Sequence, residues 1–283
     1  MITINLIEDW AAFLRGWMPL NGLQYDEAQS VRQNTERYLN AIRRIVHPQP
    51  RRVHESKELR VPELHTGDYA VLKALIERGD DIRDYLSRDI VNERAARYDR
   101  LLNAWGIQHL HFRPCGTRDV LFAKITDTEV YVIQALPHGR CNEEVWAEPS
   151  LLQILHDNWP GALGVGSTGL HAESLTGADR LKLWKANINF ITTVADGTSY
   201  VAPGGGLTTS GQCVFDARNC DRIFADLDGW RRTFEANEQE LRTALNIPPA
   251  DQLAVKAVFE GDGHGIGFYV PSRNIMLSFR LRE

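Results

Sequence analysis

The sequence of 283 residues lacks the features that mark several large classes of protein. No apolar run approaches the ~20 residues that a transmembrane helix requires, and the first residues contain no basic region of the kind that opens a signal peptide. The four cysteines are widely spaced and form no C-x-x-C pair, which argues against a cysteine-rich zinc site and against a disulfide scaffold. We therefore predict a cytoplasmic protein without membrane association.

Common catalytic motifs are missing as well. The sequence contains no GxSxG, HExxH or GxGxxG, which disfavours the usual hydrolase, zincin and dinucleotide-binding mechanisms. The glycine-rich run from Pro203 to Gly206 lacks the GK[ST] ending of a P-loop, so a tight turn is the simpler interpretation, with a phosphate cradle as the alternative. We predict no cofactor.

Hydrophobic residues make up 43% of the chain, which is ample for one or two packed domains. The net charge of -5 argues against polyanion binding by the whole surface, but not against a local basic groove. Eight Arg or Lys residues face three acids between Arg32 and Pro62. This segment is either a solvated helix face and linker or a phosphate-binding surface.

The spacing of apolar residues predicts an α+β fold with a helical N-terminal third, a central antiparallel sheet and a second mixed α+β half. The period changes from 3.6 to 2 after Gly106, where IQHLHF, VLFAKIT and VYVIQAL read as three consecutive strands. A glycine-rich stretch near Gly164 precedes the last part of the chain, which contains a hairpin turn at Asp196–Gly197. We accordingly expect three regions: 1–106, 107–163 and 164–283.

Three histidines of the predicted sheet form the best candidate site. His109 and His111 are two residues apart, so alternation along a strand places both on one face. Arg113 continues this face if the strand extends that far. His138 ends the third strand, and a meander of three strands can bring it near the pair.

Other polar and aromatic residues accompany these histidines within about forty residues of sequence. Arg118 and Lys124 lie on or beside the middle strand, and Trp146 follows in the next loop. Imidazole, guanidinium and a flat aromatic ring suit RNA cleavage, in which a base takes the 2′-hydroxyl proton, cations stabilise the phosphorane and a base stacks on the ring. We predict catalytic roles for His109, His111, His138 and Arg118, and substrate binding by Arg113, Lys124 and Trp146, with no metal ion.

The run RDVLFAKITDTEVYVIQALPH, from Arg118 to His138, resembles the sheet of RelE/ParE-type bacterial toxins, part of the wider barnase-EndoU-colicin-RelE group. Those proteins have an arginine leading into an apolar strand, a tight acidic turn, and a strand ending in a basic or aromatic residue. The resemblance implies a toxin-like ribonuclease. It places Arg118 at a strand arginine of such nucleases and His138 at a catalytic or substrate-binding position. RNA, and a protein partner or inhibitor, are the partners that it implies.

Two alternatives to a ribonuclease remain open. A metal-binding enzyme could use H-x-H and a third histidine as ligands, an arrangement similar to that of cupin barrels. Against it, no carboxylate falls within the five residues after His111. A non-catalytic module could instead bind protein or nucleic acid through its strand edges and the basic segment between Arg32 and Arg60.

Overall fold

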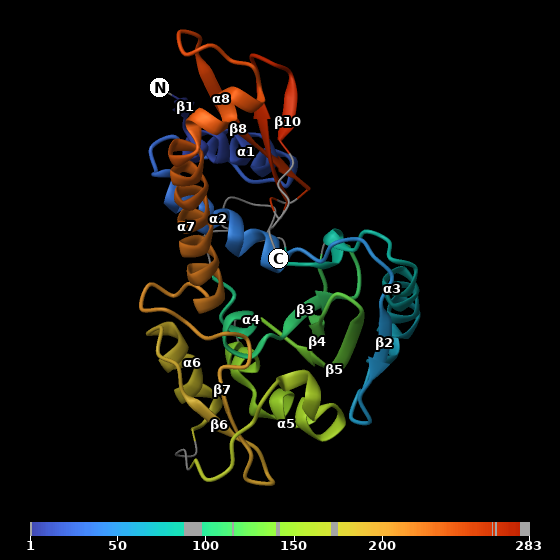
Figure 1. The fold of residues 1–283 in the computed structure, drawn as a ribbon. Coiled ribbons are helices and arrows are strands. Elements are labelled where there is room, and N and C mark those ends of the chain that lie inside the picture. Colours follow the sequence, from blue (N-terminus) through green and yellow to red (C-terminus); the bar gives the residue numbers. More distant parts are fainter. Residues whose placement is uncertain are drawn as a thin grey trace. The chain divides into compact units, whose positions relative to one another are not determined.

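The computed structural model describes residues 2–87, 98–114, 116–139, 142–170, 175–261, 263 and 265–277. The fold is α+β, as predicted (Figure 1). The chain forms two compact units, one comprising Met1–Ile42 with Arg218–Glu283 and the other Arg43–Ala217. Both boundaries predicted from the sequence, after 106 and after 163, lie inside the second unit. Pairing between the two ends of the chain creates the first unit, and local periodicity gives no sign of such distant pairing.

The first unit is built on a sheet of order β1-β8-β9-β10. Its strands are β1 (Ile2–Ile4), β8 (Leu253–Glu260), β9 (Gly265–Val270) and β10 (Ile275–Leu277). β1 pairs parallel with β8, and the other pairs are antiparallel. Helix α1 (Leu6–Leu20) packs on β8 through Trp10, whose ring lies 4.9 Å from that of Phe259. Helix α8 (Glu238–Ala244) belongs to the same unit.

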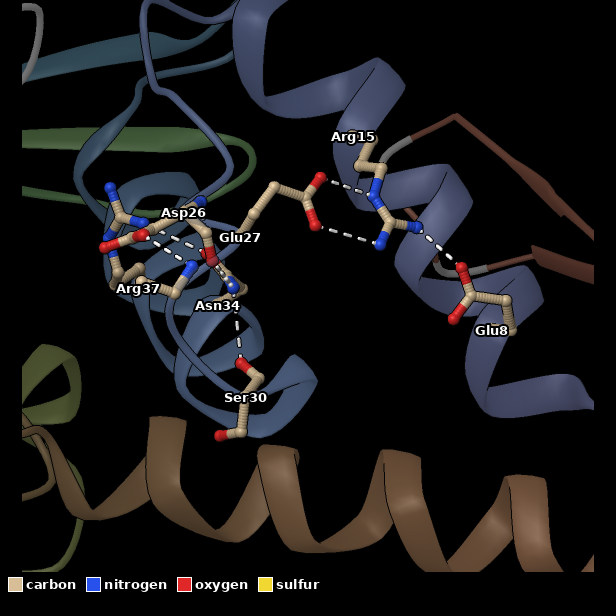
Figure 2. A network of polar contacts seen from close by, with 8 residues as sticks. Glu8, Arg15, Asp26, Glu27, Ser30, Asn34 and Arg37 are labelled. Atoms are coloured by element: carbon tan, nitrogen blue, oxygen red, sulfur yellow. Dashed lines mark hydrogen bonds and ion pairs between the residues drawn. The ribbon is translucent and has the colours of Figure 1, made fainter.

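A polar network fixes the loop between α1 and helix α2 (Val31–Arg44) (Figure 2). The guanidinium of Arg15 lies between the carboxylates of Glu8 and Glu27, at 2.7 and 2.8 Å. The buried amide of Asn34 accepts the backbone N–H of Asp26 and donates to its carbonyl oxygen. The exposed ion pairs contribute little to stability, because water screens their charges. The buried amide therefore holds the loop more than the charges do.

The second unit contains the predicted meander. Strands β3 (Gln108–His111), β4 (Asp119–Ile125) and β5 (Glu129–Pro137) are antiparallel neighbours. The sheet has one further strand, because residues expected in a loop form β2 (Arg52–Glu55), which pairs parallel with β5. The sheet order is therefore β2-β5-β4-β3. Val120, Leu121, Phe122 and Ala123 are all fully buried, so β4 is covered on both faces.

Helices and short turns cover this sheet. Helix α3 (Thr66–Arg78) follows the 3-10 turn η1 (Glu63–His65) and contacts β2, while α5 (Pro149–Asn158) contacts β5. Among the described residues of this unit, the other elements are η2 (Arg83–Tyr85), α4 (Arg100–Trp105), η5 (Glu143–Ala147), η6 (Pro160–Leu163), α6 (Gly177–Lys185), β6 (Ile191–Thr193) and β7 (Ser199–Val201). Strands β6 and β7 form the hairpin predicted at Asp196–Gly197. Helix α7 (Val214–Ala236), like α2, contributes residues to both units.

The glycine-rich run 203–206 caps the end of α4. Gly204 and Gly206 donate their N–H groups to the carbonyls of Ala104 and Asn103, and Gly205 donates to Ala202. These three donors are therefore occupied within the protein, which supports the tight-turn interpretation over a phosphate cradle.

We expect Gly204→Ala to destabilise the second unit. A Cβ atom at Gly204 would overlap the backbone nitrogen of Gly106 and the carbonyl oxygen of Leu102. Backbone atoms cannot swing aside as a flexible side chain can, so the free energy of unfolding should fall by about 1–3 kcal/mol. Gly161→Ala is the matched control, since nothing lies within 4 Å of its added Cβ. Urea titration of both variants is the measurement, and equal midpoints would contradict the prediction.

Candidate functional site

The structure brings the three predicted histidines together. The ring centroid of His111 lies 5.9 Å from that of His109 and 5.4 Å from that of His138. The Trp146 ring joins them, at 4.8 Å from His109 and 5.4 Å from His138. Strand pairing explains this cluster, because His111 lies opposite Val120 on β4, which in turn lies opposite Leu136 on β5, two residues before His138.

The backbone of one residue, Thr117, orients two of these rings. Its N–H donates to Nδ1 of His111 at 3.0 Å. Its carbonyl accepts from Nε2 of His138 at 3.0 Å, so that nitrogen carries a proton. In the neutral form of His138 the lone pair is then on Nδ1, which makes Nδ1 a proton acceptor.

The Thr117 side chain holds its own turn in place. Its hydroxyl accepts the N–H of Phe112, just after β3, at 3.1 Å and donates to the carbonyl of Asp119, at the start of β4, at 2.6 Å. Thr117 therefore ties β3 to β4 at the point where the histidines meet. The sequence analysis did not identify this residue, because a threonine in a turn carries no distinctive signal.

His109, His138 and Trp146 line a cleft of about 620 Å³ in the second unit. That volume falls within the usual range for ligand sites, roughly 300–1,000 Å³. His111 does not line the cleft and is only 9% exposed. His111 therefore lies behind the two cleft histidines, and its predicted catalytic role stays a prediction.

Charged residues from distant parts of the chain complete the cleft wall. Among the described residues that line it, Arg44, Arg100 and Lys185 are cationic, against two carboxylates, Asp99 and Glu143. Both carboxylates are already engaged. Asp99 accepts the Leu102 N–H at the start of α4, and Glu143 pairs with Lys185 at 2.9 Å. The lining therefore has a small excess of positive charge.

One hydrogen bond orients the Arg100 side chain. Its Nε donates to the carbonyl oxygen of Trp184 at 2.8 Å, which fixes the guanidinium on the cleft wall. Within the residues that the structure describes, no hydrogen bond of its two terminal nitrogens is found. Two such donors match the oxygens of a phosphate. Neither Arg100 nor Lys185 could be linked to the histidines from sequence, since they lie on α4 and α6.

Arg113, predicted to bind substrate beside the histidines, instead pairs with Asp68 of α3 at 2.7 Å. Strand β3 ends at His111, so the alternation that would have aligned Arg113 with the histidines stops two residues too early. Asp68 also contacts Nδ1 of His65, whose ring stacks on Phe112 at 4.6 Å. Arg113 therefore belongs to a separate ionic cluster that joins α3 to the end of β3.

Lys124 and Arg118 do not line the cleft either. Burial lowers the pKa of Lys124, and a Cβ added at Gly106 would lie 2.8 Å from its amine. Lys124 thus packs beside the end of α4. Arg118 is exposed, and its carbonyl oxygen accepts the backbone N–H of His138 at 2.9 Å. Arg118 therefore supports the histidine strand through its backbone, and the predicted catalytic role of its side chain stays a prediction.

Two arginines of the basic segment serve the fold rather than a ligand. The buried guanidinium of Arg51 donates to the carbonyl oxygens of His47, Gln49 and Thr126. Arg43 pairs with the buried carboxylate of Asp216. These bonds favour a structural explanation of much of the segment over a continuous phosphate-binding surface.

The described residues contain no group of three or more His, Cys, Asp or Glu side chains that could hold a metal ion. No helix in the described part of the chain is long and apolar enough to cross a membrane. Comparisons with protein families, with curated proteins and with solved structures found no match. The resemblance to RelE/ParE-type toxins therefore stays a prediction.

Proposed function

We propose that the cleft cleaves RNA by proton transfer through two histidines, with no metal ion required. The observation that carries the proposal is the placement of His109 and His138 in one cleft, both against the Trp146 ring. Two imidazoles can supply a base and an acid near neutral pH, because the side chain titrates in that range. Arg100 and Lys185 in the same cleft supply positive charge for a phosphodiester.

The cleavage step follows from the orientation of His138. Its Nδ1 takes the proton of a 2′-hydroxyl, and the resulting oxygen forms a bond to the adjacent phosphorus. The bond from phosphorus to the 5′-oxygen then breaks, and protonated His109 gives its proton to that leaving oxygen. The products are a 2′,3′-cyclic phosphate and a 5′-hydroxyl. The guanidinium of Arg100 stabilises the charge that develops on the phosphorane.

Trp146 gives the cleft a surface for a base. Its indole is half-buried against Phe122, at 5.8 Å between ring centroids, which restrains the ring while part of it faces the cleft. Bases of single-stranded RNA stack on aromatic rings of this kind, typically with ~1–3 kcal/mol per base. A base on Trp146 would hold its ribose near the two histidines.

The proposal predicts that the purified protein cuts single-stranded RNA in the presence of EDTA and leaves the same DNA sequence intact. The distinction arises because the attacking group is the 2′-hydroxyl, which DNA lacks. Gel analysis measures the cleavage, and the ends of the fragments should be 2′,3′-cyclic phosphate and 5′-hydroxyl. Cutting of DNA, or RNA cleavage abolished by EDTA, would contradict the mechanism. Binding of RNA without cleavage would favour a non-catalytic module.

A further inference from the structure

A second hollow adjoins the histidine cleft along α6. Its volume is about 630 Å³, and it shares Glu143, Leu181 and Lys185 with the cleft. The ion pair between Lys185 and Glu143 therefore marks the border between the two. Both side chains of this pair are more than half exposed, and exposed ion pairs contribute little to stability. A ligand can displace this pair at small cost, which would join the two hollows into one groove.

Lys182 supplies a cation to the second hollow, whose lining also contains Lys185 and the carboxylates of Glu143 and Glu144. It is exposed and lies one turn before Lys185 on α6, so both side chains project from one side of the helix. No ion pair of the Lys182 amine is found within the described residues. Nearby, the Asn142 side chain donates to the carbonyl oxygen of Pro137, which ties this wall of the hollow to the end of β5, next to His138. The second hollow thus continues directly from the proposed catalytic residues.

We infer that the substrate is a single-stranded RNA of several nucleotides, which occupies both hollows. This inference rests on the proposed cleavage activity and specifies its substrate class. The scissile phosphate lies between His109 and His138 with a base on Trp146. The adjoining nucleotide lies in the second hollow, with its phosphate between Lys182 and Lys185. Grooves that track a single strand commonly pair such cations with an aromatic stacking surface.

The test compares a dinucleotide, which has only the scissile phosphate, with a longer single-stranded RNA. The wild type should cut the longer RNA with the higher kcat/KM. Lys182→Ala should lower kcat/KM for the longer RNA roughly tenfold, the size expected for one hydrogen bond to a charged group, and leave the dinucleotide rate unchanged. Lys256→Ala is the control, because Lys256 is exposed, lines neither hollow and lies outside the basic segment.

The affinity for a 2′-deoxy oligonucleotide, which the mechanism cannot cut, measures binding in the groove independently of RNA cleavage. The logarithm of the binding constant falls linearly with the logarithm of the salt concentration. Loss of the Lys182 contact should reduce the steepness of this line by about one. Equal effects of Lys182→Ala on short and long RNA, or no effect on either, would overturn the extended groove and leave the cleavage activity standing. Binding that depends on Lys182 without any RNA cleavage would overturn the proposed activity and retain the groove. Neither cleavage nor binding would overturn both.

Discussion

His138→Gln should lower the rate of RNA cleavage by about 100- to 10,000-fold, the usual effect of removing one general acid or base. The glutamine amide can still donate to the Thr117 carbonyl, as Nε2 of His138 does at 3.0 Å. It cannot take up a proton as Nδ1 does. The substitution therefore removes the proposed chemistry while it keeps the hydrogen bond that ties the end of β5 to the Thr117 turn.

The fold and the chemistry can be measured separately in this experiment. Circular dichroism and the midpoint of thermal unfolding should match those of the wild type, while single-turnover cleavage reports the rate. His47→Ala is the matched control, since His47 is exposed and does not line the cleft. Its cleavage rate should equal that of the wild type. Full activity in His138→Gln would remove this residue from the mechanism.

His111→Ala has a different expected signature from His138→Gln. His111 accepts the Thr117 N–H and lies behind the cleft, so its loss frees the turn that also orients His138. Both the rate and the stability should then fall. A variant that loses only the rate would assign His111 a direct catalytic role, as the sequence first indicated.

The histidine cluster could be predicted from sequence because every step toward it is local. Alternation along β3 aligns His109 with His111, and two short turns return the chain through β4 and β5 to His138. The cations of the cleft could not be predicted, because Arg100 and Lys185 come from helices whose placement depends on packing. Trp105 and Trp184 illustrate this packing, with ring centroids 4.9 Å apart across α4 and α6.

The sequence-based errors share one physical cause, since each extends a local pattern past the point where tertiary contacts intervene. Arg113 leaves the histidine face because β3 has ended and Asp68 offers a partner. The segment of β2 was interpreted as a linker because its residues are mostly polar. Its parallel pairing with β5, some 75 residues away, leaves no local pattern in the sequence. Likewise, the pairing of β1 with β8 divides the chain in a way that no composition shift indicates.

Arg43→Ala should reduce the free energy of unfolding by about 3–5 kcal/mol near neutral pH, the usual cost of leaving a buried charge unpaired. The carboxylate of Asp216 is 7% exposed and lies 3.1 Å from the Arg43 guanidinium. The same guanidinium also hydrogen-bonds the amide oxygen of Asn103, which is fully buried. Without Arg43, the Asp216 charge would remain in a site with little access to water.

Two further variants, a control ion pair and a double variant, separate the effect of the unpaired Asp216 charge from a general loss of packing. Arg32→Ala breaks the ion pair with Asp221, in which both side chains are about half exposed or more. The free energy of unfolding should fall by about 1 kcal/mol or less. The double variant with Arg43→Ala and Asp216→Asn has no buried charge, so it should recover part of the lost stability. Urea unfolding of the single and double variants measures each contribution.

The pH dependence of Arg43→Ala has a definite sign. Burial already raises the pKa of Asp216, while the charge of Arg43 lowers it. Removal of Arg43 therefore raises that pKa further, and the folded variant binds the proton more tightly than the unfolded chain, whose Asp titrates at about 3.9. The deficit relative to the wild type should thus shrink as the pH falls from 7 through the raised pKa of Asp216. A deficit that is independent of pH, or no larger than that of Arg32→Ala, would show that the Asp216 charge does not depend on Arg43.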